Sequence, residues 1–158
     1  MRIGIGYDIH KLVTERTLYL GGIKIDYPKG LLGHSDGDVL LHALVDALLG
    51  AAGLGDIGEF FPDTDPAYKG ANSVLFVENV VSLLHDKHGF EIVNIDCTVF
   101  ARAPKLGSVR DDIRKNLAWL LHLEPAAANV KFKTMNDIGL VGRGEAIAAE
   151  VAVLIKEV

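Results

Sequence analysis

The sequence predicts an α+β protein in which helices cover one face of a mixed sheet. The first observation is the order of strand-like and helix-like segments, which runs β-β-β-α-α-β-α-β-β and is typical of α+β proteins. The second is length, because 158 residues fit one domain, residues 1–158, and can bury a substantial core. The third is a composition of 49% hydrophobic and 23% charged residues, which is ordinary for a globular protein.

Charge and composition argue against several classes of function. A net charge of −5 and an isoelectric point near 5.6 disfavour binding to nucleic acid or to a membrane surface. No apolar run approaches the length of a membrane span, and Met1 leads directly into the first strand without a targeting segment. The single cysteine, Cys97, lies in a predicted strand, where a core role is favoured over a nucleophilic one. We therefore expect a cytoplasmic protein.

The N-terminal third predicts a strand, a hairpin and a helix. Residues 2–9 form the strand, and residues 17–25 form the hairpin around a Gly-Gly turn. Residues 26–37 are expected to be mostly loop. Asp36 or Asp38 then caps a helix that ends near Gly53.

That helix carries a polar line within an otherwise apolar sequence. Its buried face is predicted from the spacing of its leucines and valines. Asp38, His42 and Asp46 follow one another at intervals of four residues on another face. An imidazole in such surroundings requires a polar partner. The buried face comprises Leu41, Leu44, Val45, Leu48 and Leu49.

The rest of the chain alternates between helices and strands. Ser108 and Asp111 resemble a capping box at the start of the third helix. The predicted segments are a loop over 53–72, a helix over 73–88, a strand over 91–101, a helix over 108–121, a strand over 129–134, a glycine-rich connection over 139–144 and a strand over 147–155.

The last strand is apolar on both faces. It combines small alanines with branched isoleucine and valine, so neither face is clearly polar. A sheet that is apolar on both faces needs a second cover, and the chain has too few helices to supply one. We therefore expect the chain to oligomerise through its strands.

Asp8, His10 and His42 are candidate metal ligands. If the first strand continues to His10, the side chains of Asp8 and His10 leave the same face. One carboxylate and two imidazoles form a typical catalytic zinc set with an open position. The alternative is structural: Asp8 could close a turn, His10 could be an exposed strand residue, and His42 could bond to Asp38 or Asp46.

Several stretches resemble the 2-C-methyl-D-erythritol 2,4-cyclodiphosphate synthase family. The match covers the whole chain in order, and the long histidine-bearing stretch is highly specific. The stretches are RIGIGYDIH from Arg2, GHSDGDVLLHA from Gly33, GDIG from Gly55 with FPDTDP from Phe61, ARAPK from Ala101 and GRGE from Gly142.

The resemblance implies an enzyme, a phosphorus-oxygen lyase of the non-mevalonate isoprenoid precursor pathway. It would cyclise 4-diphosphocytidyl-2-C-methyl-D-erythritol 2-phosphate to 2-C-methyl-D-erythritol 2,4-cyclodiphosphate and release CMP. It also implies a homotrimer that packs its sheets around a threefold axis, with active sites between subunits. Zn²⁺ and a second divalent cation, Mg²⁺ or Mn²⁺, would be the cofactors.

The resemblance also assigns roles to individual residues. Asp8, His10 and His42 would bind zinc, His34 and Thr134 would stabilise the transition state, and Asp46 would steer the His42 ring. The substrate would contact Ser35, Asp56, Ile57, Gly58, Phe61, Pro62, Asp63, Thr64 and Asp65. The cytidine diphosphate would contact Ala101, Arg102, Ala103, Pro104, Lys105, Leu106, Lys133 and Thr134 of the adjoining subunit. Leu140 and Arg143 match positions near the trimer axis, where some members hold an isoprenoid diphosphate.

One residue departs from the family pattern. Asn136 stands where the family usually has a glutamate that helps to hold the second cation. A neutral amide oxygen is a weaker ligand for a hard cation such as magnesium. We expect the cation to rely on substrate phosphates and water, with Asn136 as a weak ligand or Asp137 brought in by a local bulge.

Two other functions remain open from the sequence. A zinc phosphate-ester hydrolase would use the same three ligands with an activated water and would leave the Ala101–Lys105 stretch without a nucleotide role. The other is a non-catalytic trimer that binds isoprenoid diphosphates and needs neither the metal ligands nor the nucleotide stretch. The intact Asp8, His10, His34 and His42 argue against it.

Overall fold

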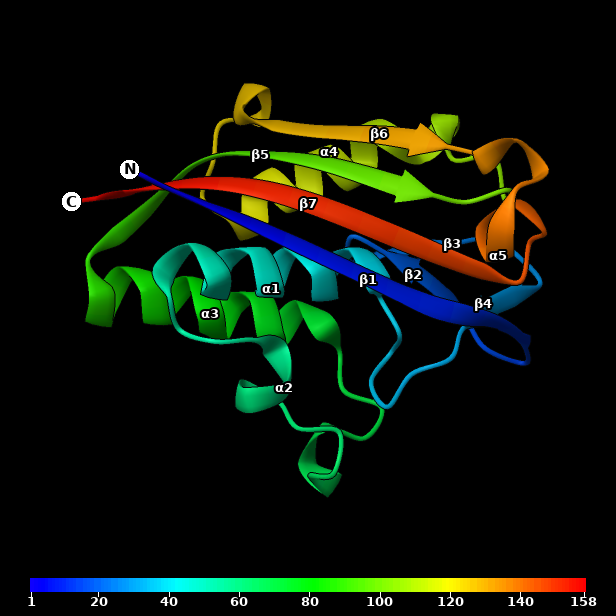
Figure 1. The fold of residues 1–158 in the computed structure, drawn as a ribbon, viewed down its shortest axis with the longest axis horizontal. Helices are drawn as coiled ribbons and strands as arrows, with labels where there is room; N and C mark the ends of the chain where they lie inside the picture. The colour runs from blue at the N-terminus through cyan, green and yellow to red at the C-terminus, as the bar shows by residue number, and fades with distance from the viewer.

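The computed structural model describes all residues 1–158 and shows a mixed sheet with helices packed on one face (Figure 1). The five-stranded sheet has the order β4-β1-β7-β5-β6, and only the β5–β6 pair is parallel. The α+β prediction is therefore confirmed. The strands are β1 (Arg2–Thr14), β4 (Lys29–Leu31), β5 (Phe90–Phe100), β6 (Ala128–Lys133) and β7 (Ala146–Glu157), and a separate hairpin joins β2 (Leu18–Leu20) to β3 (Ile23–Ile25).

Three longer helices accompany the sheet. They are α1 (Val39–Ala52), α3 (Ser73–His88) and α4 (Arg110–Leu120). Shorter helical turns are α2 (Ile57–Phe60), α5 (Gly139–Gly142), η1 (Pro66–Tyr68), η2 (Gly107–Val109), η3 (Pro125–Ala127) and η4 (Met135–Asp137). None of the helices is long and apolar enough to cross a membrane.

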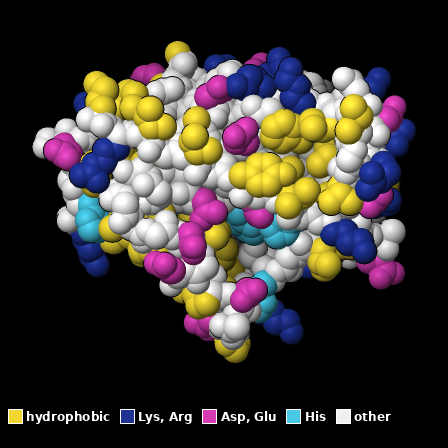
Figure 2. Space-filling view, viewed as in Figure 1, with side chains coloured by type: hydrophobic (Ala, Val, Ile, Leu, Met, Phe, Trp, Pro, Cys, Tyr) yellow, Lys and Arg dark blue, Asp and Glu magenta, His cyan; other side chains and the backbone are white.

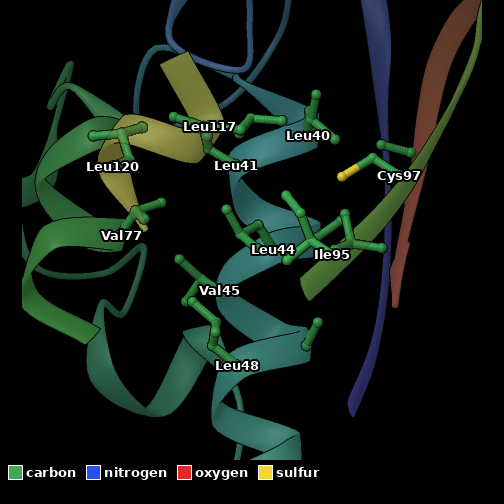
Figure 3. Close-up of a cluster of buried hydrophobic side chains, with 14 of the residues drawn as sticks. Leu40, Leu41, Leu44, Val45, Leu48, Val77, Ile95, Cys97, Leu117 and Leu120 are labelled. Carbon is green, nitrogen blue, oxygen red and sulfur yellow. The ribbon is translucent and has the colours of Figure 1, made fainter. Parts of the chain in front are cut away.

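Helix α1 is the centre of the core because it is buried on nearly all sides. Figure 3 shows Leu40 and Leu44 on the side of the sheet, near Ile95 and Cys97, while Val45 lies on the side of α3. A helix that is apolar all round is stable only when other elements enclose it. Cys97 of β5 is also buried, so it is a core side chain, as predicted. Its burial raises the pKa of the thiol to about 12.

Strand β1 lies directly against α1 because two of its residues have no side chain. A Cβ atom added to Gly4 would lie 1.9 Å from the Ala47 carbonyl oxygen, and one added to Gly6 would lie 1.9 Å from that of Ala43. Even-numbered residues of β1 therefore face the helix. Asp8 continues this face, so the glycines bring its carboxylate close to α1.

The odd-numbered residues of β1 form an apolar surface on the other face of the sheet. Ile3, Ile5, Tyr7 and Ile9 are all exposed, the first by 72%. Figure 2 shows a broad gathering of hydrophobic side chains beside a hollow lined by histidine. From Ala149 to Lys156, buried positions of β7 alternate with more exposed ones, and the outward residues are Glu150, Ala152, Leu154 and Lys156. The sheet therefore has an uncovered and largely apolar face, but β1 supplies most of it, whereas the last strand, which was predicted to be apolar on both faces, carries Glu150 and Lys156 on this side.

Some local predictions were wrong. β1 continues past residue 9 to Thr14, where it pairs with β4 inside the segment expected to be loop. The predicted 53–72 loop contains α2 and η1, and the glycine-rich connection contains α5. The Ser108–Asp111 capping box does not form, because η2 takes up residues 107–109 and α4 begins at Arg110 without a side-chain cap.

Candidate metal centre and active-site cleft

Asp8, His10 and His42 converge at the junction of β1 and α1. One potential ligand atom from each lies within 4.8 Å of the others. Asp8 Oδ2 is 2.8 Å from His10 Nε2 and 3.1 Å from His42 Nδ1, and the two imidazole nitrogens are 3.2 Å apart. The period of two along β1 places Asp8 and His10 on the face that α1 covers. The alternative in which the three residues serve unrelated structural roles does not explain this convergence.

His10 is held by the backbone of the neighbouring loop. Its Nδ1 lies 2.5 Å from the Leu32 carbonyl oxygen, which can only accept a hydrogen bond. Nδ1 therefore carries the proton and donates it. The lone pair of Nε2 is then directed towards Asp8, which is the arrangement that a metal-binding imidazole requires.

The charges of the cluster suit a cation. Burial alone would raise the pKa of Asp8, but the neighbouring His10 and His42 side chains hold it well below its ordinary value. Burial would lower the pKa of His10, yet the Asp8 carboxylate and the Leu32 carbonyl raise it. The site thus holds an ionised carboxylate beside two imidazoles. This donor set fits zinc, since one carboxylate and two imidazole ligands leave a coordination position open.

Asp46, which the resemblance expects to steer the ring, makes no hydrogen bond to His42. Its Oδ1 accepts a 2.8 Å hydrogen bond from the Ile57 amide, so it ties α1 to the start of α2. Burial raises its pKa, although that hydrogen bond opposes the change. The Nε2 atom of His42 instead lies 2.9 Å from the Ser73 hydroxyl and 3.0 Å from the Ser35 hydroxyl. Ser73 is a residue that the sequence analysis missed, because a serine at a helix start looks like an ordinary capping residue.

The cluster opens into a cleft of about 470 Å³. Phe61 stacks on Phe76 with ring centroids 4.4 Å apart, and Tyr68 meets both rings edge-on, so one wall is a rigid aromatic cluster. The sequence-predicted residues that line the cleft are Asp8, His10, His34, Ser35, His42, Asp46, Ile57, Gly58, Phe61, Pro62 and Asp63.

The loop that carries His34 is fixed from two sides. Arg16 donates to the carbonyls of Gly33 and Ser35, and the His34 carbonyl accepts from the Gly70 amide. His34 Nε2 donates to the Asp65 carbonyl at 3.1 Å, so the imidazole spans from this loop to the 61–65 segment. The Ser35 hydroxyl points inward to His42 rather than outward, and it lies among buried groups.

Two predicted substrate residues, Asp56 and Asp65, cap short helices with their side chains. The Asp56 carboxylate caps α2 at the Glu59 amide, and the Asp65 carboxylate caps η1 at the Ala67 amide. These two residues and Thr64 do not line the cleft. Asp65 is nevertheless linked to the cleft by its backbone carbonyl oxygen, which accepts a hydrogen bond from His34.

The predicted nucleotide residues lie elsewhere in the chain, at the ends of β5 and β6. The Ala101 amide donates to the Lys133 carbonyl, which joins the two stretches. Lys133, Thr134 and Asn136 line a separate hollow that shares no residue with the metal cleft. One chain therefore does not bring Thr134 together with His34. The predicted nucleotide stretch runs through Ala101, Arg102, Ala103, Pro104, Lys105 and Leu106.

Asn136 lies in a left-handed turn and not in a strand. Met135, Asn136 and Asp137 all have positive φ, and the Thr134 hydroxyl accepts from the Asn136 amide. The Asp137 carboxylate pairs with Arg102 at 3.2 Å. The expected bulge that would bring Asp137 to a cation is therefore replaced by a turn in which Asp137 has a basic partner.

Leu140 and Arg143 lie in and just after α5, beside the small apolar cluster of Phe100, Val141 and Ala148. Leu140 is 51% exposed, and Arg143 pairs with Glu145. The structure thus places an exposed leucine and an arginine in the short segment that precedes β7.

Fold and site define an α+β protein whose sheet and first helix hold a candidate metal centre at the head of an aromatic-walled cleft. The model of the YgbB family matches residues 1–156. The chain belongs to this family.

Named relatives and solved structures support the same family assignment. A "2-C-methyl-D-erythritol 2,4-cyclodiphosphate synthase" of Alkaliphilus oremlandii is 53% identical over 157 residues, which is 99% of each chain. A structure named bifunctional IspDF, from Campylobacter jejuni, is 43% identical with a TM-score of 0.94; the match covers 99% of this chain and 42% of that one. This chain thus spans less than half of that bifunctional protein. A Plasmodium falciparum structure named an IspF CDP complex is 38% identical with a TM-score of 0.86, and covers 99% of this chain and 96% of the other. The curated relatives are enzymes, namely lyases, and the predicted family is confirmed.

Proposed function

We propose that this protein cyclises 4-diphosphocytidyl-2-C-methyl-D-erythritol 2-phosphate to the 2,4-cyclodiphosphate and releases CMP. The observation that carries the proposal is the convergence of Asp8, His10 and His42 at the head of the cleft, in a chain whose relatives bear the name of this synthase. An oxygen of the 2-phosphate attacks the β-phosphorus. The bond from that phosphorus to the bridging oxygen breaks, and CMP leaves with the bridging oxygen.

The reaction joins two anionic groups, so the protein must offset charge and align the attack. Asp8, His10 and His42 would hold zinc, which when bound supplies a Lewis acid for a phosphate oxygen. His34 reaches across the cleft to the 61–65 segment and is placed to orient a phosphate there. The stacked Phe61 and Phe76 rings line the cleft and would exclude water from one side of a bound substrate.

The proposed assembly is a homotrimer with active sites between subunits. The uncovered apolar face of β1 and β7 supports association through the sheet. Separation of the metal cleft from the Lys133–Thr134 hollow supports a site built from two chains, because within one chain these predicted nucleotide residues do not line the metal cleft. The exposed Leu140 and the nearby Arg143 suit an isoprenoid diphosphate near the axis of this assembly.

The second divalent cation would be held mainly by substrate phosphates and water. Asn136 offers one neutral oxygen, and the Asp137 carboxylate is already paired with Arg102. Asn136→Glu is therefore expected to lower the magnesium concentration needed for half-maximal activity. An unchanged magnesium requirement in this variant would contradict the proposed weakness of the site.

Phosphorus NMR tests the function directly. Purified protein with the diphosphocytidyl substrate, zinc and magnesium is expected to form CMP and a cyclic diphosphate together, and His42→Ala is expected to form neither. Leu75→Ala, on the exposed side of α3, is the matched control and should behave as the unaltered protein. CMP with a linear phosphate would instead identify a hydrolase.

A further inference from the structure

The far side of the His42 ring is bound to a short chain of buried polar groups. His42 Nε2 lies 2.9 Å from Ser73 Oγ, and Ser73 is completely buried as the first residue of α3. Ser73 Oγ lies 2.5 Å from Asp36 Oδ1, and the Ser73 amide donates to Asp36 Oδ2 at 3.0 Å. Asp36 in turn accepts from the Asp38 amide. The contacts connect His42 in α1 with the loop before α1 and with the start of α3.

The direction of each hydrogen bond in this chain follows from what its members can donate. A carboxylate only accepts, so the hydroxyl hydrogen of Ser73 is committed to Asp36. The Ser73 oxygen is then left as an acceptor for His42, which places the ring proton on Nε2. The Ser35 hydroxyl lies 3.0 Å from the same nitrogen, and it can direct its own hydrogen to the Ser73 oxygen, 3.3 Å away. The lone pair of His42 is consequently on Nδ1, which is the nitrogen that faces Asp8 and His10.

We propose that Ser73, oriented by Asp36, is the positioning residue that fixes the ring orientation and tautomer of His42 for zinc. Leu32 has the same effect on His10 through its carbonyl oxygen, so both imidazoles present one defined nitrogen to the centre. Partners of this kind orient metal-bound histidines in many proteins, and their loss typically weakens metal binding about 10- to 100-fold. The inference rests on the proposed function only in taking Asp8, His10 and His42 as the zinc ligands.

Zinc affinity, measured by competition with a chromophoric chelator, tests this role without any substrate. Ser73→Ala removes the acceptor and is expected to weaken zinc binding about 10- to 100-fold. Ser73→Thr keeps the hydroxyl and is expected to retain most of the affinity. Asn72→Ala is the matched control, because Asn72 caps the same helix through the Val74 amide and does not contact His42. It is expected to bind zinc as the unaltered protein does.

Zinc binding by Ser73→Ala as tight as that of Asn72→Ala would overturn the proposal. Should Ser73→Ala fail to fold, nitrogen-15 NMR of the zinc-loaded unaltered protein decides the question. A proton on His42 Nε2 with metal on Nδ1 supports the proposal, and the reverse assignment overturns it. His42→Ala separates the two proposals: if it binds zinc normally, the proposed metal site is wrong, whereas a loss in His42→Ala but not in Ser73→Ala refutes only the role of Ser73.

Discussion

Asp38 shows how one buried side chain can position a catalytic region without contacting it. Its carboxylate accepts from the amides of Gly21 and Gly22 in the β2–β3 turn and from the Leu41 amide in α1. Burial raises its pKa, while the three amides favour its ionised form. Because Asp38 is the N-cap of α1, it fixes where that helix begins, and His42 follows one turn later.

Asp38→Ala is expected to lower the free energy of unfolding by about 3 kcal/mol, since it removes a helix cap and leaves two turn amides without an acceptor. Urea unfolding followed by circular dichroism measures the change. Asn72→Ala, which removes an exposed cap of α3, should cost about 1 kcal/mol. Equal losses in the two variants would show that the link from Asp38 to the hairpin contributes nothing.

Single residues also show the limits of sequence analysis. Asp8 and His10 could be paired from the alternation of a strand, because that regularity is local. The hydrogen-bond partner of the His42 ring could not be predicted in this way. Helical spacing pointed to Asp46, whereas the ring hydrogen-bonds to Ser73, which is distant in sequence. Which side chain reaches the His42 ring depends on how α3 packs beside α1. Residue spacing within α1 alone carries no information about this packing.

At the level of elements, the site depends on the close contact of β1 with α1. Gly4 and Gly6 allow the strand backbone to lie against Ala43 and Ala47, and any side chain at these glycines would meet a carbonyl oxygen. The interval between Gly6 and Asp8 is one strand repeat, so the contact sets the distance between Asp8 and His42.

Gly6→Ala is expected to destabilise the protein by about 3 kcal/mol and to weaken zinc binding roughly tenfold, because β1 must move away from α1. Thermal unfolding and zinc titration measure the two effects. Gly50→Ala is the control: a Cβ there meets nothing within 4 Å, and alanine in a helix should stabilise by about 0.5–1 kcal/mol. Unchanged zinc affinity in Gly6→Ala would show that the contact does not set the site.

The elements that were predicted correctly from the sequence have strong local signals, such as regularly spaced apolar residues or a glycine turn. Helices α1 and α3 and the β2–β3 hairpin were expected at the correct places, since their apolar spacing and glycine signals are local. The extension of β1 to Thr14 and the short β4 were missed because each exists only through pairing with the other. The start of α4 was missed because η2 occupies the residues that would form the capping box.

At the scale of the whole molecule, the sheet has one covered and one uncovered face. The exposed isoleucines of β1 lie on the uncovered face, and the metal ligands lie on the covered one. Association through the uncovered face therefore leaves the metal ligands of each chain in place. We therefore expect metal binding and the proposed assembly to be separable properties of this fold.

Ile5→Glu is expected to convert the proposed trimer of about 51 kDa, three chains of 17.0 kDa, into monomers that still bind zinc. A charge on the apolar face opposes burial of that face. Sedimentation analysis measures the mass, and Leu75→Glu, which places the same charge on exposed α3, should remain assembled. Monomers in the unaltered protein would refute the proposed assembly.

The separation of the metal cleft from the Lys133–Thr134 hollow also has a genetic consequence. Two alleles that are each inactive, His42→Ala and Thr134→Ala, should complement one another when expressed together. In the proposed threefold ring every mixed trimer would contain one junction at which an intact cleft meets an intact hollow. Random mixing should then restore about a quarter of the full activity. A pair of alleles that both alter the cleft, such as His42→Ala with Asp8→Ala, should restore none.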